Sequence, residues 1–175
     1  MEAQNTSGRI SPWLAVQSLA WTILIPGTVT GFVPWRYFGL SETRVDLGNP
    51  VQVGALLAIA AGALLLLACI WEFARSGRGT LAPVDPPREL VVRGLYRYTR
   101  NPMYVGVTTV LAGELLLVRT RTMLGYALVW LLAVNVFVMA YEEPTLRAKF
   151  GESYVRYTKE VGRWLPSLRR KDGGR

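Results

Sequence analysis

The chain has no histidine and only one cysteine, Cys69, among its 175 residues. A single cysteine excludes a disulfide within the chain, and a zinc site is not expected because cysteine and histidine are the usual zinc ligands. Any acid–base chemistry must therefore use Glu, Asp, Tyr, Lys, Arg or solvent. Acidic residues are also few, 12 against 20 Lys and Arg. A basic chain can bind nucleic acid, but these basic residues flank long uncharged runs, which favours a membrane protein.

The scarcity of charge in long stretches predicts the architecture. Four stretches with almost no charged residue lie at about 11–34, 50–72, 103–118 and 122–141. A helix crosses a bilayer with roughly 20 apolar residues, so each stretch is a candidate span. The whole chain, 1–175, is expected to form one all-α integral membrane domain with four transmembrane helices. A loop at 76–102 joins the second and third spans and is expected to bind a soluble cofactor.

Small residues recur every four positions in the second span, at Gly54, Ala58 and Gly62. This spacing would let another helix approach closely, although it also suits an ordinary lipid-facing helix. The third and fourth spans are joined by so few residues that they must pack as an antiparallel hairpin. Within this hairpin, Glu114 is expected to reach the far interface or to pair with one of the arginines in the turn, Arg119 or Arg121.

The pattern after the fourth span predicts an amphipathic helix over 144–161. Apolar residues recur there at intervals of three or four, at Leu146, Phe150, Tyr154, Tyr157 and Val161. Such a helix would lie on the membrane surface or over a site beside it. After it, Trp164 suits an interfacial anchor, and residues 167–175 are expected to form a flexible tail.

The distribution of basic residues predicts the orientation in the membrane. Sixteen of the 20 Lys and Arg fall in the N-terminus, in the stretch between the second and third spans and in the C-terminus, and four fall in the other two loops. Basic residues concentrate on the cytoplasmic side of membrane proteins. Both termini and the cofactor loop are therefore expected to face the cytoplasm, and the small, arginine-rich chain suggests the inner membrane of a prokaryotic cell.

Two polar clusters lie next to predicted spans and are expected to meet at one membrane face. The first is Arg93-Gly-Leu-Tyr-Arg-Tyr-Thr-Arg-Asn-Pro-Met-Tyr-Val-Gly106, and the second is Tyr141-Glu-Glu-Pro144. Glu142 and Glu143 are adjacent, so their side chains point in different directions. A carboxylate that faces inward at membrane depth is a candidate functional group, and a helix end that simply reaches water is the alternative. Asn135 and Met139 share a helix face with Glu142, and Asn135 could hydrogen-bond another helix.

Three motifs in order carry a resemblance to a known superfamily. They are Leu90-Val-Val-Arg-Gly-Leu-Tyr-Arg-Tyr-Thr-Arg-Asn-Pro-Met-Tyr-Val-Gly106, then Tyr141-Glu-Glu-Pro-Thr-Leu with Phe150-Gly-Glu-Ser-Tyr-Val-Arg-Tyr, then Val161-Gly-Arg-Trp-Leu-Pro166. Over roughly residues 80–166, the chain resembles the isoprenylcysteine carboxyl methyltransferase and phospholipid methyltransferase superfamily. The first two spans carry little of this signal.

The resemblance implies an integral membrane enzyme that transfers a methyl group from S-adenosylmethionine to a lipophilic small molecule or lipid. It implies catalytic roles for Asn101, Glu142 and Glu143. It also implies that a larger set of residues contacts the cofactor. These are Arg88, Glu89, Leu90, Val91, Gly94, Tyr96, Arg100, Asn101, Pro102, Met103, Tyr104 and Glu142. No metal is implied.

Two departures from the superfamily pattern bear on the acceptor. The superfamily usually has His-Pro where this chain has Asn101-Pro102, and an asparagine amide is neither a cation nor a base near neutral pH. Prenylcysteine enzymes also have an arginine about one turn before the glutamate pair, whereas residues 136–139 are uncharged here. A neutral, amine or thiol acceptor is therefore favoured over a prenylcysteine carboxylate, although a carboxylate, an amine and a thiol all stay among the expected acceptors. An NADPH-dependent membrane reductase of the sterol-reductase type and a non-catalytic membrane adaptor remain the alternatives.

Overall fold

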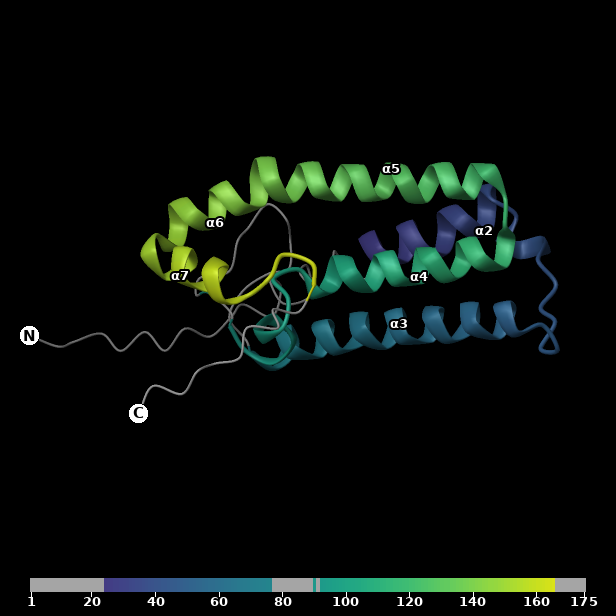
Figure 1. The fold of residues 1–175 in the computed structure, drawn as a ribbon, viewed down its shortest axis with the longest axis horizontal. Coiled ribbons are helices and arrows are strands. Elements are labelled where there is room, and N and C mark those ends of the chain that lie inside the picture. The colour runs from purple at the N-terminus through teal and green to yellow at the C-terminus, as the bar shows by residue number, and fades with distance from the viewer. Residues whose placement is uncertain (1–23, 77–89, 91, 166–175) are drawn as a thin grey trace, which may run out of the picture.

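The computed structural model describes residues 24–76, 90 and 92–165, and its described parts are helical, without a strand. Three long helices run alongside one another: α3 (Pro50–Ser76), α4 (Pro102–Val118) and α5 (Arg121–Phe137). A shorter helical segment, η1 (Thr28–Phe32) and α2 (Val33–Tyr37), lies beside them and is followed by the single turn η2 (Leu40–Glu42). The all-α fold class is confirmed (Figure 1).

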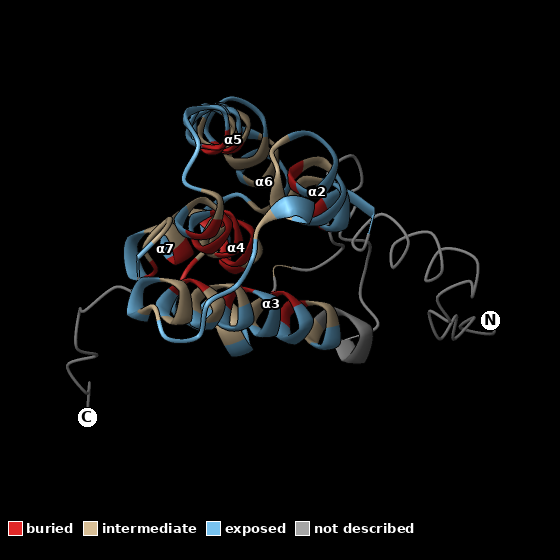
Figure 2. Ribbon diagram, turned by 90° about the vertical axis from the view of Figure 1, so that its right-hand side faces the viewer, coloured by how far each residue is buried: buried red, intermediate tan, exposed pale blue. Residues whose placement is uncertain are grey.

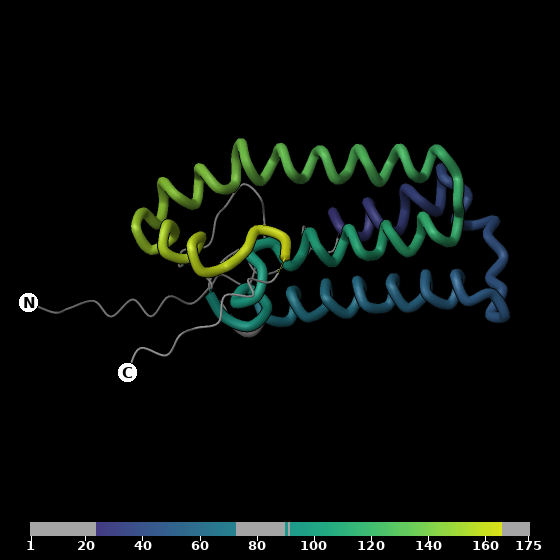
Figure 3. Tube along the Cα trace, in the orientation of Figure 1, coloured from purple at the N-terminus to yellow at the C-terminus, as the bar shows by residue number. Residues whose placement is uncertain are grey.

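The fourth predicted span continues beyond α5 without a break. The chain passes from α5 through a π-helical turn, η4 (Val138–Glu142), into α6 (Glu143–Phe150), and then turns into α7 (Glu152–Glu160). Figure 3 shows this path as one long rod followed by a short return at one end of the molecule. A 3₁₀ turn, η3 (Gly94–Arg97), precedes α4 at the same end.

Two helices, Pro50–Glu72 and Arg121–Phe150, are long and apolar enough to cross a membrane. Their outer surfaces keep large apolar side chains exposed, a composition that suits contact with lipid; Leu57, Leu64, Leu67, Leu128 and Leu132 are examples. Helix α4 is also apolar but has only 17 residues, fewer than the roughly 20 of a typical span. The described part of the predicted span at 11–34 begins at residue 24.

The helix starts follow from local sequence. Asn49 precedes Pro50, and its side-chain oxygen accepts a hydrogen bond from the Val51 amide at 3.0 Å, which caps α3. Helix α4 begins with Pro102, whose missing N–H has no partner at a first helical position in any case. Thr120 caps α5 by accepting from the Met123 amide at 3.2 Å.

The core lies where α4 meets its neighbours. The end-on view in Figure 2 shows buried residues concentrated on α4, with α3 on one side of it and α5 on the other. The main buried cluster joins one leucine of α3 and the first residues of α5 to the middle of α4. Its members are Leu66, Val107, Val110, Leu111 and Met123.

Glycines bring α3 and α4 into close antiparallel contact. A Cβ added at Gly62 would lie 2.7 Å from the Gly106 carbonyl oxygen, and one added at Gly113 would lie 2.6 Å from that of Ala55. Gly62 therefore contacts another helix as its spacing predicts, but Gly54 does not, because no atom lies within 4 Å of its Cβ position. The contacting row in α3 passes through Ala55 instead.

The predicted amphipathic helix is two helices rather than one. Gly151 separates α6 from α7 with a φ of 53°, which favours glycine because side chains rarely tolerate it. The apolar residues of α7, Tyr154 and Tyr157, are buried with Val161 against Leu90, Leu146 and Phe150. The apolar side of α7 is therefore covered by α6 and by Leu90 of the loop before α4.

Glu114 is buried in α4, with 3% of its surface exposed. One of its carboxylate oxygens has no hydrogen-bond partner. The expected ion pair with Arg119 or Arg121 is therefore wrong. Both arginines are exposed, because α4 ends before Arg119 and the helix buries Glu114 one turn earlier on its inner face.

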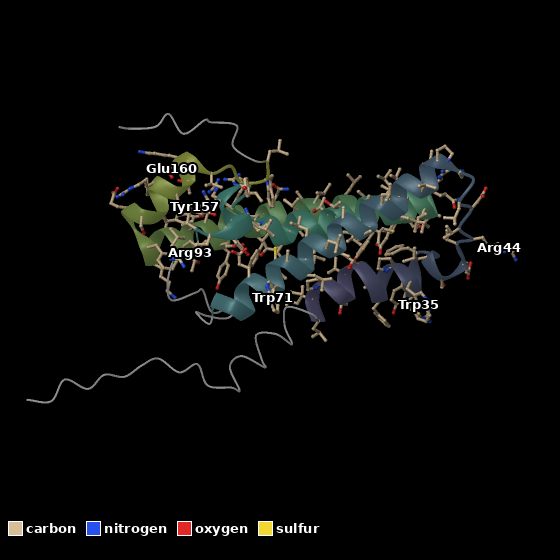
Figure 4. All side chains as sticks on the ribbon, turned by 90° about the horizontal axis from the view of Figure 1, so that it is seen from below. Trp35, Arg44, Trp71, Arg93, Tyr157 and Glu160 are labelled. Carbon is tan, nitrogen blue, oxygen red and sulfur yellow. The ribbon has the colours of Figure 1, made fainter. Side chains whose placement is uncertain are left out.

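The loops alternate between the two ends of the molecule. Figure 4 shows Arg93, Tyr157 and Glu160 at the end formed by α6 and α7, and Arg44 at the opposite end, with Trp35 toward that end. The third and fourth predicted spans also run antiparallel, as the short turn between α4 and α5 requires.

Candidate active site

The two polar clusters of the sequence meet at the end of the bundle. The Tyr104 hydroxyl, near the start of α4, donates to Oε2 of Glu142 at 3.1 Å. Arg100, just before α4, donates from Nη1 to Oε1 of Glu143 at 2.9 Å. The convergence predicted for these clusters is therefore present, with Glu142 ending η4 and Glu143 beginning α6.

The two adjacent glutamates have different surroundings. Glu143 also accepts two hydrogen bonds from Arg163, one from Nε to Oε1 at 2.7 Å and one from Nη2 to Oε2 at 2.8 Å, so two arginines neutralise it. This bidentate contact raises the pKa of Arg163. Glu142 accepts from Tyr104 and forms no ion pair within the described part of the chain. Of the pair, Glu142 is the carboxylate left to bind an added cation.

Asn101 holds the C-terminal segment that follows α7. Its side-chain amide donates to the Arg163 carbonyl at 3.1 Å, and the Thr99 hydroxyl donates to the same carbonyl at 3.0 Å. The Arg100 amide donates to the Gly162 carbonyl at 2.9 Å. Asn101 and Thr99 are both buried. The residue that stands in place of the superfamily histidine therefore fastens residues 99–101 to 162–163.

Further contacts hold the loop before α4 in place. The Tyr157 hydroxyl on α7 donates to the Tyr96 carbonyl at 2.7 Å, and the Leu95 amide donates to Oε2 of Glu72 at 3.2 Å. Burial raises the pKa of Tyr157, so its phenol keeps the proton that it donates. The loop is thus held by the end of α3 on one side and by α7 on the other.

The other residues predicted to contact the cofactor lie in different surroundings. Leu90 packs against the α7 cluster, Met103 packs against the main core, and Pro102 is buried at the start of α4. Gly94 begins η3 with a φ of 53°. Three predicted cofactor contacts, Arg88, Glu89 and Val91, lie outside the described residues.

Sequence reasoning did not find the roles of Arg163 and Trp164. The Trp164 indole donates to Oδ1 of Asn135 on α5 at 3.1 Å, so in this structure it bridges to another helix, where an interfacial anchor was expected. Asn135 was expected to hydrogen-bond another helix, whereas its partner Trp164 lies in the non-helical segment after α7, and its side-chain amide also donates to the Leu131 carbonyl. Both missed residues belong to the third motif of the superfamily resemblance, which was the available signal.

The described part of the chain is helical, two of its helices are long and apolar enough to cross a membrane, and a polar cluster lies at one end of the bundle. The model of the family described as phospholipid methyltransferase matches residues 50–153, more than half of the chain. The chain belongs to this family, and the superfamily resemblance of the sequence motifs is confirmed.

Two relatives extend this comparison. An uncharacterized protein of Haemophilus influenzae is 42% identical over 57 residues, which are 29% of this chain and 90% of that protein. A methanethiol S-methyltransferase of Pseudomonas deceptionensis is 37% identical over 82 residues, which are 45% of this chain but only 29% of that enzyme. No solved structure matches the chain.

Proposed function

We propose that the protein is an S-adenosylmethionine-dependent methyltransferase that acts on a lipophilic acceptor at the cytoplasmic face of a membrane. Family membership supports methyl transfer. The relative named methanethiol S-methyltransferase supports a thiol as one kind of acceptor. The observation that carries the proposal is Glu142, a partly buried carboxylate that the described chain leaves without an ion pair, beside the loop that the superfamily uses for its cofactor.

The chemistry of the residues around Glu142 fits this cofactor. Its amino-acid portion carries an ammonium group, which suits the Glu142 carboxylate that Tyr104 holds in place. Main-chain groups around Gly94 and the ring of Tyr96 would hold the adenosine. When bound, the cofactor supplies a methyl group on a positively charged sulfur, ready for direct displacement. The task left to the chain is to align the acceptor with that methyl group.

Asn101 and Glu143, implied as catalytic by the resemblance, are proposed here as positioning residues. An asparagine amide does not act as a base, and Asn101 already binds the Arg163 carbonyl. Glu143 is neutralised by Arg100 and Arg163. Both residues keep the segment at 162–164 against the start of α4. The proton that a thiol or amine acceptor loses is proposed to leave to solvent at this end of the bundle.

The finer membrane topology is part of the proposal. We place four spans in the inner membrane of a prokaryotic cell, with both termini and the cofactor loop in the cytoplasm. Support comes from the two qualifying helices, the apolar character of α4 and the bias of basic residues toward one side. The opposite placement of Arg44 and Arg93 in Figure 4 supports the alternation of loops.

Calorimetric titration of the detergent-purified protein with S-adenosylmethionine and S-adenosylhomocysteine tests the cofactor. We expect both to bind, and Glu142→Gln to weaken each at least about tenfold. A charge-assisted hydrogen bond contributes about 1.5–3 kcal/mol, and 1.4 kcal/mol is a factor of ten in affinity. Glu152→Gln is the matched control, because this exposed glutamate at the start of α7 is removed without touching the site.

NADPH serves as the competing ligand in the same titration. Binding of NADPH alone would instead support the reductase, whose pyrophosphate needs cationic partners. Failure of every ligand to bind folded protein would support the non-catalytic adaptor. Equal loss of affinity in Glu142→Gln and Glu152→Gln would remove Glu142 from the site.

A further inference from the structure

Glu72 lies near the end of α3, against the loop that precedes α4. Its side chain is half-buried, and Oε2 accepts a hydrogen bond from the Leu95 amide at 3.2 Å. The contact joins α3 to the 3₁₀ turn η3, although the two residues are 23 positions apart in the chain. The first N–H groups of a helical turn have no partner within the turn, and the Arg93 side chain does not cap η3. The carboxylate of a distant helix therefore takes the place of a local cap.

Gly94 leaves the room that this carboxylate occupies. A Cβ added at Gly94 would overlap both carboxylate oxygens of Glu72. Gly94 also has a φ of 53°, which side chains rarely tolerate. The missing side chain thus serves two purposes, the path of the main chain into η3 and the close approach of Glu72.

The turn that Glu72 holds carries Tyr96, the residue after Leu95. Burial raises the pKa of the Tyr96 phenol, and smaller contributions come from Cys69 and from Glu142. The phenol is therefore close enough to Glu142 to interact with its charge. Glu142 is the carboxylate proposed above to bind the cofactor, so the position of η3 bears directly on the site.

The loop is held from two sides. Tyr157 on α7 donates to the Tyr96 carbonyl, and Asn101 and Thr99 bind the Arg163 carbonyl, so these contacts tie the loop to the C-terminal part of the chain. Glu72 ties it to α3, whose backbone packs closely on that of α4. Glu72 thereby sets the position of η3 relative to the closely packed helix pair.

We propose that Glu72 is a positioning residue for methyl transfer, which fills the space beside Gly94 and holds the Leu95 amide so that Tyr96 stays next to Glu142. Glu72 acts through the main chain of η3 and not by contact with the reacting atoms. Its effect on cofactor binding rests on the proposed function, whereas the order of η3 is measurable without the cofactor.

Calorimetric titration with S-adenosylhomocysteine measures the effect on the site. Apparent affinity falls with the fraction of molecules in the binding conformation, so we expect Glu72→Ala to weaken binding about three- to tenfold. Glu72→Gln keeps an oxygen that can accept from the Leu95 amide, and it should bind within about twofold of the wild type. This rescue separates the hydrogen bond from a general loss of stability.

The close approach of Glu72 to Gly94 gives a sharper test. Gly94→Ala would force the flexible Glu72 side chain away, so the contact to Leu95 is lost in that variant too. Adding Glu72→Ala to Gly94→Ala should therefore weaken binding by less than about twofold more, because coupled changes are not additive.

Gly39→Ala is the matched control for backbone strain. Gly39 also has a positive φ, 80°, but nothing lies within 4 Å of its Cβ position. Gly39→Ala should lower the melting temperature and leave S-adenosylhomocysteine affinity unchanged. In this background Glu72→Ala should keep its full three- to tenfold effect on affinity, because distant changes are roughly additive.

Hydrogen exchange of the cofactor-free protein, measured by mass spectrometry, reports the order of η3 directly. We expect the amides of residues 94–98 to exchange faster in Glu72→Ala and in Gly94→Ala, because local opening limits exchange. Exchange of the same amides should stay near that of the wild type in Glu72→Gln and Gly39→Ala.

Unchanged S-adenosylhomocysteine affinity in Glu72→Ala would overturn the proposal. Additive losses in the variant that combines Gly94→Ala with Glu72→Ala would do so too, as would a Glu72→Gln variant as impaired as Glu72→Ala. If the wild type binds neither S-adenosylmethionine nor S-adenosylhomocysteine, the proposed function fails. Exchange at residues 94–98 then decides alone whether Glu72 orders η3, and unchanged exchange in Glu72→Ala would reject that role.

Discussion

Helix α4 meets its two long neighbours in different ways. Toward α3 it presents a row at helical spacing made of Gly106, Val110, Gly113 and Leu117, and the glycines let the two backbones approach closely. Toward α5 it presents Tyr104 and Thr108, whose hydroxyls hydrogen-bond Glu142 and Trp130. The first face is closed by main chain and aliphatic groups, and the second is bridged by a few directional bonds.

We propose that the first face is a structural frame and that the second is the surface at which the ligand binds. A backbone contact at van der Waals distance leaves no room for a ligand, because protein interiors are packed to crystal density. On the other face, Tyr104, Trp130 and Glu142 are joined by single hydrogen bonds to their neighbours or to one another and are only half-buried. The face of α4 toward α3 should therefore tolerate no added atoms, whereas the face toward α5 should respond mainly in ligand binding.

The largest expected effect comes from filling the closed face. Gly62→Leu places side-chain atoms where even a Cβ would lie 2.7 Å from the Gly106 carbonyl oxygen. Backbone cannot move aside as a flexible side chain can, so we expect a loss of about 3 kcal/mol or more in the free energy of unfolding. Denaturant or thermal unfolding in detergent micelles measures it.

Gly54→Leu is the control for this substitution. It lies in the same helix and makes the same chemical change, but nothing lies within 4 Å of its Cβ position. We expect it to be neutral or slightly stabilising, because leucine has the higher helix propensity. Similar destabilisation by both variants would contradict the contrast drawn between the faces of α4.

A smaller effect is expected from loosening the polar end. Glu143→Gln weakens the contacts to Arg100 and Arg163, which hold the start of α4 against the C-terminal segment. Hydrogen bonds to charged groups contribute about 1.5–3 kcal/mol to stability. Because the Glu143 side chain is 22% exposed, we expect the free energy of unfolding to fall by an amount near the lower of these values. Unfolding of Glu143→Gln, Arg163→Gln and the double variant forms the cycle that measures the coupling.

The cycle separates positioning from catalysis. If Glu143 acts through Arg163, the double variant should be scarcely worse than either single variant. Cofactor affinity should fall with stability, and the shape of the pH–rate profile should not change. Additive losses, or a lost pH limb in Glu143→Gln alone, would show a separate chemical role for this carboxylate.

The helices could be predicted because their causes are local. Long uncharged runs define α3 and α5, and proline with a preceding asparagine marks the starts of α3 and α4. The break at Gly151 could not be found by periodicity, because the apolar spacing continues through it from Phe150 to Tyr154. The left-handed φ of one glycine changes the path without changing the pattern.

The site could be predicted only in part, for a related reason. Adjacency indicates that Glu142 and Glu143 point in different directions, but it does not indicate which of them meets an arginine. That depends on Arg163, which the chain returns to Glu143 from 20 residues away. The π-helical turn η4 (Val138–Glu142) also separates α5 from the glutamate pair. Sequence spacing does not reveal this turn, although it changes the direction in which the two glutamates point relative to α5.

The smallest expected effect concerns a third row of α4, formed by Val107, Leu111, Glu114 and Val118. The row packs in the apolar core apart from Glu114, whose Oε2 has no hydrogen-bond partner. A buried acceptor without a partner costs free energy that an apolar side chain of similar size does not. Glu114→Leu is therefore expected to leave methyl transfer unchanged and to raise the free energy of unfolding by up to about 1 kcal/mol.

Thermal unfolding of Glu114→Leu and of the control Glu160→Leu, measured in parallel, checks this expectation. The control removes an exposed glutamate from α7 and gains no core contact. If Glu114→Leu loses stability or activity while Glu160→Leu does not, the carboxylate has a partner or a task in the folded protein. The division of α4 into a closed face and a proposed ligand-binding face would then have to include a second polar site on this third row.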